Sequence, residues 1–299
     1  MTGSAMPVNA QGAPMARPGR RRFNLTWLGL VPFLVFSTLF LLIPTFYLIV
    51  GSFRDSTGQF TLQNYAGLTN EIPLNAYKTS IEISLVTALA GGIFGFLMAY
   101  AVISAGPSRF RSGLMTFSGV ASNFAGVPLA LAFIFTIGRA GLLTGLLAGL
   151  GINPYDSGFS LYSKLGLEIV YFYFQLPLMI LIIAPAIDGL KVEWREASEN
   201  MGAQTWQFWR YVALPVLMPS LLGSMILLFG NAFGAQATAY QLTGGFINIV
   251  TILIGNQLTG DVLHNVGAGY ALAMGMVGIL TMTLIAYQFL QRRSERWLR

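Results

Sequence analysis

The chain has 299 residues, of which 55% are hydrophobic and 9% are charged, whereas an ordinary soluble domain carries about 25% charged residues. It contains no cysteine and one histidine, His264. Disulfide frameworks, thiolate metal sites, cysteine nucleophiles and multi-histidine metal sites are therefore excluded. The composition indicates a membrane protein, because too little charge is present to cover a soluble surface.

The chain begins with a polar segment. Residues 1–22 are mainly Gly, Ala, Pro and Arg, a composition that predicts a disordered basic tail in the cytoplasm. No repeat or linker divides the remainder, so we expect residues 23–299 to form a single transmembrane domain. The first apolar run is longer than the core of a signal peptide, which favours a retained anchor helix.

Six stretches have the roughly 20 mainly apolar residues that a spanning helix requires. The six predicted spans are Trp27–Val50, Ile81–Ser104, Thr116–Ile137, Leu167–Ile187, Val216–Thr238 and Gly267–Leu290. Two further apolar runs, Gly141–Gly151 and Phe246–Ile254, are too short to span and are expected to be re-entrant or interfacial. The expected fold class is an all-α polytopic membrane protein with six transmembrane helices.

Most of the 17 Lys and Arg residues lie in the two termini and in the loops after the second and fourth spans. Short loops rich in these residues stay in the cytoplasm. The predicted topology therefore has both termini inside. The net charge of +6 reflects this topology, and no nucleic-acid partner is expected.

The centres of the spans hold no charged residue, and Glu82, Glu168 and Asp188 lie at span ends. This pattern disfavours a carrier driven by an ion gradient. Asn231 in the fifth span requires a polar partner, either in a neighbouring helix or in a substrate pathway. The candidate pathway-lining residues are Asn123, Tyr171, Tyr173, Ser224 and Asn231.

The loop Gly189–Pro215 is the long polar segment between spans on the predicted cytoplasmic side. Trp194, Ala197 and Met201 share one face of a predicted short helix, which Gly202 ends. A second short helix is predicted over Thr205–Val212, before the next span begins. Such a pair of helices suits docking to a soluble partner. An interfacial amphipathic hairpin without a partner fits the pattern equally well.

The loop carries a recognisable motif. Glu196-Ala197-Ser198, three residues, Gly202, nine residues, and Val212-Ala213-Leu214-Pro215 resemble the EAA signature of type I ABC importer permeases. The family pattern is Glu-Ala-Ala, three residues, Gly, nine residues, Ile, one residue, Leu-Pro. Ser198 replaces the second Ala and Val212 replaces Ile. Gln204 stands where the family has a Ser that caps the second helix, so Thr205 is the expected cap.

The resemblance implies a permease that performs no catalysis, binds no cofactor or metal, and lies in the bacterial inner membrane. Its implied partners are membrane lipid, a second permease subunit, identical or paralogous, two cytoplasmic ABC ATPases and a periplasmic or lipid-anchored substrate-binding protein. The implied ATPase-coupling residues are Glu196, Ala197, Ser198, Gly202, Leu214 and Pro215. No Lys lies in a P-loop pattern, so hydrolysis must come from another chain.

Within this family the chain is most similar to the spermidine/putrescine branch, on Ile254-Gly255-Asn256 and Gly267-Ala268. The resemblance implies import of a polyamine. Phosphonate, thiamine and iron permeases are related alternatives. An ion-gradient-driven secondary carrier and a membrane scaffold without transport activity are alternatives from other classes.

Overall fold

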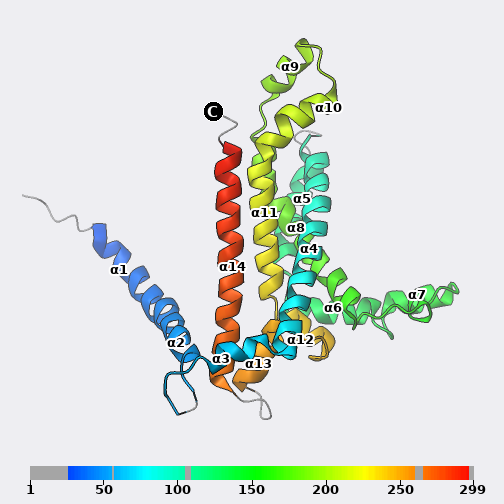
Figure 1. Ribbon diagram of the computed structural model, residues 1–299. Coiled ribbons are helices and arrows are strands. Elements are labelled where there is room, and N and C mark those ends of the chain that lie inside the picture. Colours follow the sequence, from blue (N-terminus) through cyan, green and yellow to red (C-terminus); the bar gives the residue numbers. More distant parts are fainter. Residues whose placement is uncertain (1–25, 56, 105–108, 260–264, 296–299) are drawn as a thin grey trace, which may run out of the picture. The chain divides into compact units, whose positions relative to one another are not determined.

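The computed structural model describes residues 26–55, 57–104, 109–259 and 265–295, and the predicted tail over residues 1–22 lies outside them. The described residues are mainly helical, with connecting turns and loops, and an isolated antiparallel bridge joins Arg54 and Phe60. Figure 1 shows the helices. They are α1 (Thr26–Ser37), η1 (Thr38–Leu42), α2 (Ile43–Ser52), α3 (Gln63–Ala66), η2 (Gly67–Thr69), α4 (Glu71–Ser104), α5 (Arg109–Asn123), α6 (Val127–Ile137), α7 (Leu142–Gly149), η3 (Pro154–Ser157), α8 (Lys164–Asp188), α9 (Val192–Asn200), α10 (Thr205–Phe208), η4 (Trp209–Ala213), α11 (Leu214–Gly234), α12 (Ala237–Thr243), α13 (Val250–Thr259) and α14 (Val266–Glu295).

The chain divides into two compact units, Met1–Tyr47 and Leu48–Arg299. Six described segments are long and apolar enough to cross a membrane, which confirms the predicted number. They are Gly29–Ser52, Glu71–Ser104, Val127–Gly149, Lys164–Asp188, Thr205–Gly234 and Val266–Phe289. In the first of these, none of the most apolar residues is buried.

Two short π-helical segments, η1 and η4, interrupt the first and fifth spans. Each lies immediately before an α-helix whose second residue is proline, Pro44 in α2 and Pro215 in α11. Proline has no N–H to donate to the carbonyl four residues earlier. The preceding residue bonds five residues back instead, from Ile43 to Thr38 and from Leu214 to Trp209. The wider turn is therefore the local consequence of the proline.

The larger unit is built around the contact between α4 and α8. Gly91 and Gly95 of α4 face Gln175 and Met179 of α8. A Cβ atom on Gly91 would lie 2.7 Å from the Gln175 Cβ, and one on Gly95 would lie 2.6 Å from the Met179 Cβ. The absence of side chains at Gly91 and Gly95 therefore allows α4 and α8 to lie close together. Gly230 and Gly234 of α11 have the same spacing but no such contact, because a Cβ on Gly234 would meet nothing within 4 Å.

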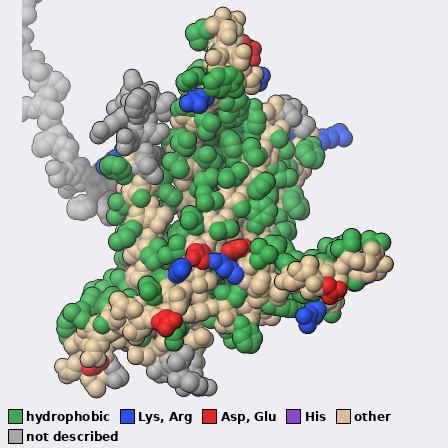
Figure 2. All heavy atoms as spheres, turned by 45° about the vertical axis from the view of Figure 1, so that its right-hand side comes forward, with side chains coloured by type: hydrophobic (Ala, Val, Ile, Leu, Met, Phe, Trp, Pro, Cys, Tyr) green, Lys and Arg blue, Asp and Glu red, His purple; other side chains and the backbone are tan. Residues whose placement is uncertain are grey.

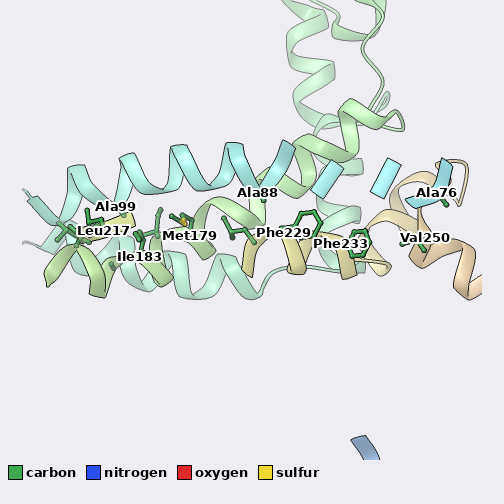
Figure 3. Close-up of a cluster of buried hydrophobic side chains, with 14 of the residues drawn as sticks. Ala76, Ala88, Ala99, Met179, Ile183, Leu217, Phe229, Phe233 and Val250 are labelled. Atoms are coloured by element: carbon green, nitrogen blue, oxygen red, sulfur yellow. The ribbon is translucent and has the colours of Figure 1, made fainter. Parts of the chain in front are cut away.

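The main hydrophobic core lies where α4, α8, α11, α13 and α14 meet. Figure 3 shows part of this cluster, with Met179 and Ile183 of α8 between residues of the neighbouring helices. Gln175 is fully buried there and donates from Nε2 to the Leu228 carbonyl at 2.8 Å, which joins α8 to α11. A second core lies among α4, α6, α8, α11, α12 and α13.

The third predicted span, Thr116–Ile137, is wrong as a continuous helix. It is split into α5 and α6 around Gly126, whose φ of +73° favours glycine. Pro128 then lies at the start of α6, where its missing N–H costs little. By length and composition alone, the third apolar segment is Val127–Gly149, which consists of two helices, α6 and α7, and includes most of the run 141–151. The run 246–254 overlaps the start of α13, a short apolar helix.

Two ion pairs join the ends of α8 to neighbouring helices, one to α5 and the other to α4. Arg111 in the first turn of α5 bonds Asp188, the last residue of α8, at 2.6 Å. Lys164 at the start of α8 pairs with Glu82 of α4. Helix α5 therefore runs antiparallel to α8 through the bundle. Two of the three acidic residues at the predicted span ends, Glu82 and Asp188, are thus paired.

In Figure 1, α9, α10, the start of α5 and the last turns of α14 lie at one end of the larger unit, and α3, α12 and α13 lie at the other. This is the alternation that the predicted topology requires, although the sidedness itself stays a prediction. Figure 2 shows hydrophobic side chains along the bundle, with charged side chains at its upper end and in a band across its lower part. Such a surface suits contact with lipid.

Candidate coupling loop and translocation face

The first half of the candidate coupling loop is helix α9, which confirms the predicted helix around Trp194 and Ala197. The helix ends in a Schellman motif: the Ala203 N–H donates to the Ser198 carbonyl at 3.0 Å and the Gly202 N–H to the Glu199 carbonyl at 2.9 Å. Gly202 occupies the left-handed position of this motif with a φ of +79°. A Cβ on Gly202 would meet nothing within 4 Å. Its requirement within this chain is therefore conformational.

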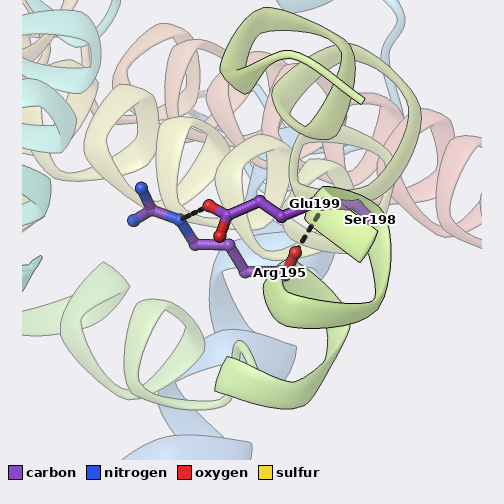
Figure 4. A network of polar contacts seen from close by, with 3 residues as sticks. All are labelled: Arg195, Ser198 and Glu199. Carbon is purple, nitrogen blue, oxygen red and sulfur yellow. Dashed lines mark hydrogen bonds and ion pairs between the residues drawn. The ribbon is translucent and has the colours of Figure 1, made fainter. Parts of the chain in front are cut away.

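The Ser198 substitution in the motif has a simple structural account. Ser198 is buried, and its hydroxyl donates to the Arg195 carbonyl at 2.7 Å, as Figure 4 shows. The polar atom is thus satisfied within the helix, and a serine replaces the smaller alanine without an unpaired group. Arg195 also pairs with Glu199 at 3.0 Å on the exposed side of α9.

The rest of α9 has little contact with the bundle. Glu196 and Ala197 are exposed, and Met201 beside them is 81% exposed. The apolar face predicted for this helix is therefore open, with acidic side chains next to it. Such a surface is typical of a helix that docks into another protein.

The second predicted helix of the loop, Thr205–Val212, is not a separate element. Helix α10 continues through η4 into α11, so Leu214 and Pro215 lie within one helical run. The expected cap at Thr205 is wrong. Gln204 is the N-cap, and its backbone N–H donates to the Gln207 side chain at 2.7 Å. A glutamine pair thus supplies the cap that the serine provides in the family pattern.

Aromatic side chains join this helical run to the bundle. The Trp209 ring lies 4.5 Å from the Tyr100 ring and 6.4 Å from the Phe96 ring, edge-on to both. Phe208 is buried beside it. These contacts attach the start of the helical run to α4, and the run itself continues into α11.

Sequence reasoning missed a second connection at this end. The Arg111–Asp188 pair lies where α8 leads into the loop. The residues are 77 positions apart, and nothing in the sequence pairs them. Their polar character at predicted span ends was the available signal.

The structure does not bring the candidate pathway residues together. Asn231 is exposed on α11, and no hydrogen-bond partner is found for it within the described chain. Ser224 lies on the same face of α11 as Asn231. It is buried, and its hydroxyl donates to the Ser220 carbonyl at 2.7 Å. Ser220 and Ser224 border a cavity of about 480 Å³ among α8, α11 and α14.

The other three candidates occupy different surroundings. Tyr171 is 1% exposed and donates its hydroxyl hydrogen to the Ala235 carbonyl, so it packs inside the chain. Tyr173 packs edge-on against Phe133 and borders an apolar cavity of about 190 Å³. Asn123 ends α5 and donates to the Gly119 carbonyl at 2.8 Å.

Relatives of the chain are transport permeases. The sulfate transport system permease protein CysT of Escherichia coli is 28% identical over 212 residues, which are 71% of this chain and 72% of that protein. The spermidine/putrescine permease protein PotB of Haemophilus influenzae is 26% identical over 277 residues, 88% of this chain and 94% of that protein.

Solved structures share the fold. A bacterial ABC transporter that imports the acidic polysaccharide alginate matches 90% of this chain and 95% of the matched chain, with a TM-score of 0.71 and 16% identity. The methionine transporter MetNI in an inward-facing conformation matches 76% of this chain and 98% of the matched chain, with a TM-score of 0.57 and 15% identity.

The family described as the inner membrane component of binding-protein-dependent transport systems matches residues 91–296, which include the whole coupling loop. This match overturns the alternatives of a secondary carrier and an inert scaffold. The chain belongs to this family: it is a multi-pass inner-membrane permease subunit of an ABC importer, a transport component and not an enzyme.

Proposed function

We propose that this permease transmits ATPase movements through the loop Gly189–Pro215 and passes a polyamine into the cytoplasm. Its proposed partners are a second permease subunit, two cytoplasmic ABC ATPases and a substrate-binding protein outside. The observation that carries the coupling role is the geometry of α9, an exposed helix with acidic and apolar side chains that Gly202 ends at positive φ. After the cap residue Gln204, α10 begins the helical run that forms the fifth span.

The coupling role is tested by Glu196→Lys and Gly202→Asp. Both positions are exposed, so both variants are expected to insert normally. They should lose substrate uptake and co-purification with the ATPase that accompanies the unmodified permease. Glu71→Lys, the same charge change at the opposite end of the bundle, is the matched control and should retain both. Normal uptake by both loop variants would remove Gly189–Pro215 as the coupling element.

The exposed face of α11 is the proposed wall of the pathway. Asn231 and Ser220 are exposed on this face, and Leu227 lies between them with 55% of its surface exposed. A second permease subunit packed against the first would enclose such a face. Tyr171 then acts behind the wall, by holding Ala235 at the end of α11.

The polyamine assignment is supported by the long alignment with PotB and by uncharged polar groups on the proposed wall. Amide and aromatic groups accommodate an organic cation without binding it as a fixed ion pair. Sulfate is the second candidate, because CysT is equally similar in sequence.

Uptake of labelled putrescine, spermidine and sulfate is compared in cells with and without this permease. The comparison distinguishes a polyamine from sulfate as the substrate. Loss of putrescine or spermidine uptake, with sulfate uptake kept, is expected. Loss of sulfate uptake alone would replace the polyamine by sulfate. Loss of neither would leave phosphonate, thiamine or iron.

The proposed sidedness places the loop Gly189–Pro215 and both termini in the cytoplasm. Because the chain has no cysteine, Gln59→Cys and Ser157→Cys introduce unique thiols on the proposed outer side. An impermeant thiol reagent should label both in intact spheroplasts, and Glu196→Cys only after lysis. The reverse pattern would invert the topology.

A further inference from the structure

A polar cavity of about 330 Å³ lies beside the helices α6 and α7, which together are called the arm here. It is lined by Arg139 and Gly141 from the turn between the two helices, by Thr144 of α7, and by Asn153, Tyr155 and Asp156 from η3 and its cap. Figure 1 shows α7 at the end of the larger unit away from α9 and α10.

The cavity holds charges of both signs that do not neutralise each other. Within the described chain, neither Arg139 nor Asp156 belongs to an ion pair, although both line the cavity. The Arg139 guanidinium carbon lies 5.8 Å from the centre of the Tyr155 ring. A paired cation and anion would have made the cavity a closed structural contact, whereas here both charges are open to a ligand.

The wall between these charges is fixed. The Tyr155 hydroxyl donates to the Ile137 carbonyl at 2.8 Å, and the Tyr155 N–H donates to the Asn153 side-chain oxygen at 3.1 Å. A tyrosine phenol is neutral near neutral pH, and burial raises the pKa of Tyr155 further. The phenol therefore leaves the Arg139 charge uncompensated. The Asn153 amide nitrogen remains as a further donor.

The outer surface of the arm is apolar next to this polar cavity. Leu142, Leu146 and Leu150 follow one another at four-residue spacing and are 74%, 62% and 76% exposed. Figure 2 shows charged side chains of both signs on the arm, next to hydrophobic ones. A polar cavity flanked by a leucine row, with an aromatic ring at the junction, matches the boundary between lipid headgroups and acyl chains.

We propose that this cavity binds a zwitterionic phospholipid headgroup, a phosphate joined to an ammonium group. The Arg139 guanidinium is the phosphate donor, since its planar fork suits phosphate oxygens. The Asp156 carboxylate faces the ammonium group. The acyl chains extend along Leu142 and Leu146. The arm is thus a lipid-anchored element at the end of the bundle opposite the coupling loop.

Native mass spectrometry of the delipidated, full-length permease tests the proposal. The probes are phosphatidylethanolamine and phosphatidylglycerol, which share a phosphate but differ in the ammonium group. Arg139→Gln should weaken binding of both lipids by about tenfold or more, as expected for loss of a charged hydrogen bond. Asp156→Asn should weaken phosphatidylethanolamine binding only. Arg54→Gln, an arginine that does not line the cavity, is the matched control and should change neither.

Equal lipid binding by Arg139→Gln and Arg54→Gln would overturn the proposal. So would displacement of phosphatidylethanolamine by millimolar soluble O-phosphoethanolamine, because that result would identify a free solute as the ligand. All three mutated side chains are exposed, and unchanged thermal stability of the variants would verify that the fold is intact.

Discussion

Two glycines of this permease are required for opposite reasons. Gly95 of α4 is buried, and a Cβ there would lie 2.6 Å from the Met179 Cβ of α8. Gly202 of the coupling loop has open space around it but a φ of +79°. Gly95 is therefore required because α4 and α8 pack closely inside the chain. Gly202 is required by its backbone conformation alone, and most side chains around it remain exposed.

The largest effect is expected at the packed contact. Gly95→Leu must separate α4 from α8, because no rotamer of the new side chain avoids the clash that its Cβ already makes. Overpacking costs about 1–3 kcal/mol in an adaptable core, and at a backbone contact we expect the upper end or loss of folding. Thermal unfolding in detergent, followed by tryptophan fluorescence, measures the effect.

Gly119→Ala is the matched control for this prediction. Gly119 also lies within a bundle helix, but a Cβ there would meet nothing within 4 Å. Its unfolding temperature should be unchanged or slightly higher, because alanine favours the helix. Equal destabilisation by Gly95→Leu and Gly119→Ala would show that close packing does not distinguish the two sites.

The coupling loop should lose function without losing the fold. A non-glycine residue in the left-handed conformation costs about 1–2 kcal/mol, least for asparagine and most for β-branched residues. ATPase association should therefore be strongest in the unmodified chain and fall through Gly202→Asn and Gly202→Ala to Gly202→Val. Co-purification with the ATPase measures this order, with the unfolding temperature as control. An asparagine variant as weak as the valine variant would place Gly202 in direct contact with the ATPase.

The sequence predicted features that depend on local chemistry. The number of spans, the α9 helix and its stop at Gly202 follow from apolar length, helical spacing and turn preference. Each of these signals lies within one segment.

Features that depend on distant segments were not predictable in this way. The break at Gly126 is stabilised by Thr238, 112 residues later, which accepts from the Gly126 N–H at 2.9 Å. Hydropathy does not reveal this break, because the apolar stretch continues on both sides of it. Tyr171 was a pathway candidate because it is polar and aromatic within a span, but its hydroxyl is used by Ala235 of another helix. A polar residue alone does not reveal which helix satisfies it.

A smaller effect is expected on the exposed face of α11. Asn231→Leu removes a polar group from the proposed pathway wall without filling a packed site, since Asn231 is exposed. The maximal uptake rate should fall severalfold. The substrate concentration at half-maximal rate should stay unchanged, because the proposed binding protein would determine it. Ser224→Ala, at a buried position on the same face, is the control and should affect uptake less. A shift in half-maximal concentration alone would place a substrate-binding site in this chain.

The smallest effect is expected in the loop after α2, where a backbone arrangement depends on one exposed carboxylate. Asp55 accepts from the Thr57 hydroxyl at 2.7 Å and from the backbone N–H groups of Thr57 and Gln59, both at 2.9 Å. The Thr57 hydroxyl bond, together with these backbone bonds, holds the pKa of Asp55 below its usual value. A lowered folded-state pKa means that the contribution is complete above the unfolded-state pKa and is lost as the pH falls through the folded-state value.

Hydrogen exchange of the loop peptide is measured for Asp55→Asn and for the unmodified chain at each pH. Comparing the two proteins at the same pH cancels the pH dependence of the intrinsic exchange rate and leaves the contribution of the carboxylate. At neutral pH the unmodified loop should be better protected, because a carboxylate is the stronger acceptor. The difference should vanish in acid, where the protonated carboxyl resembles the amide. The unfolding temperature and the uptake rate should stay the same in both proteins. A protection difference that persists in acid would show that the charge of Asp55 does not order the loop.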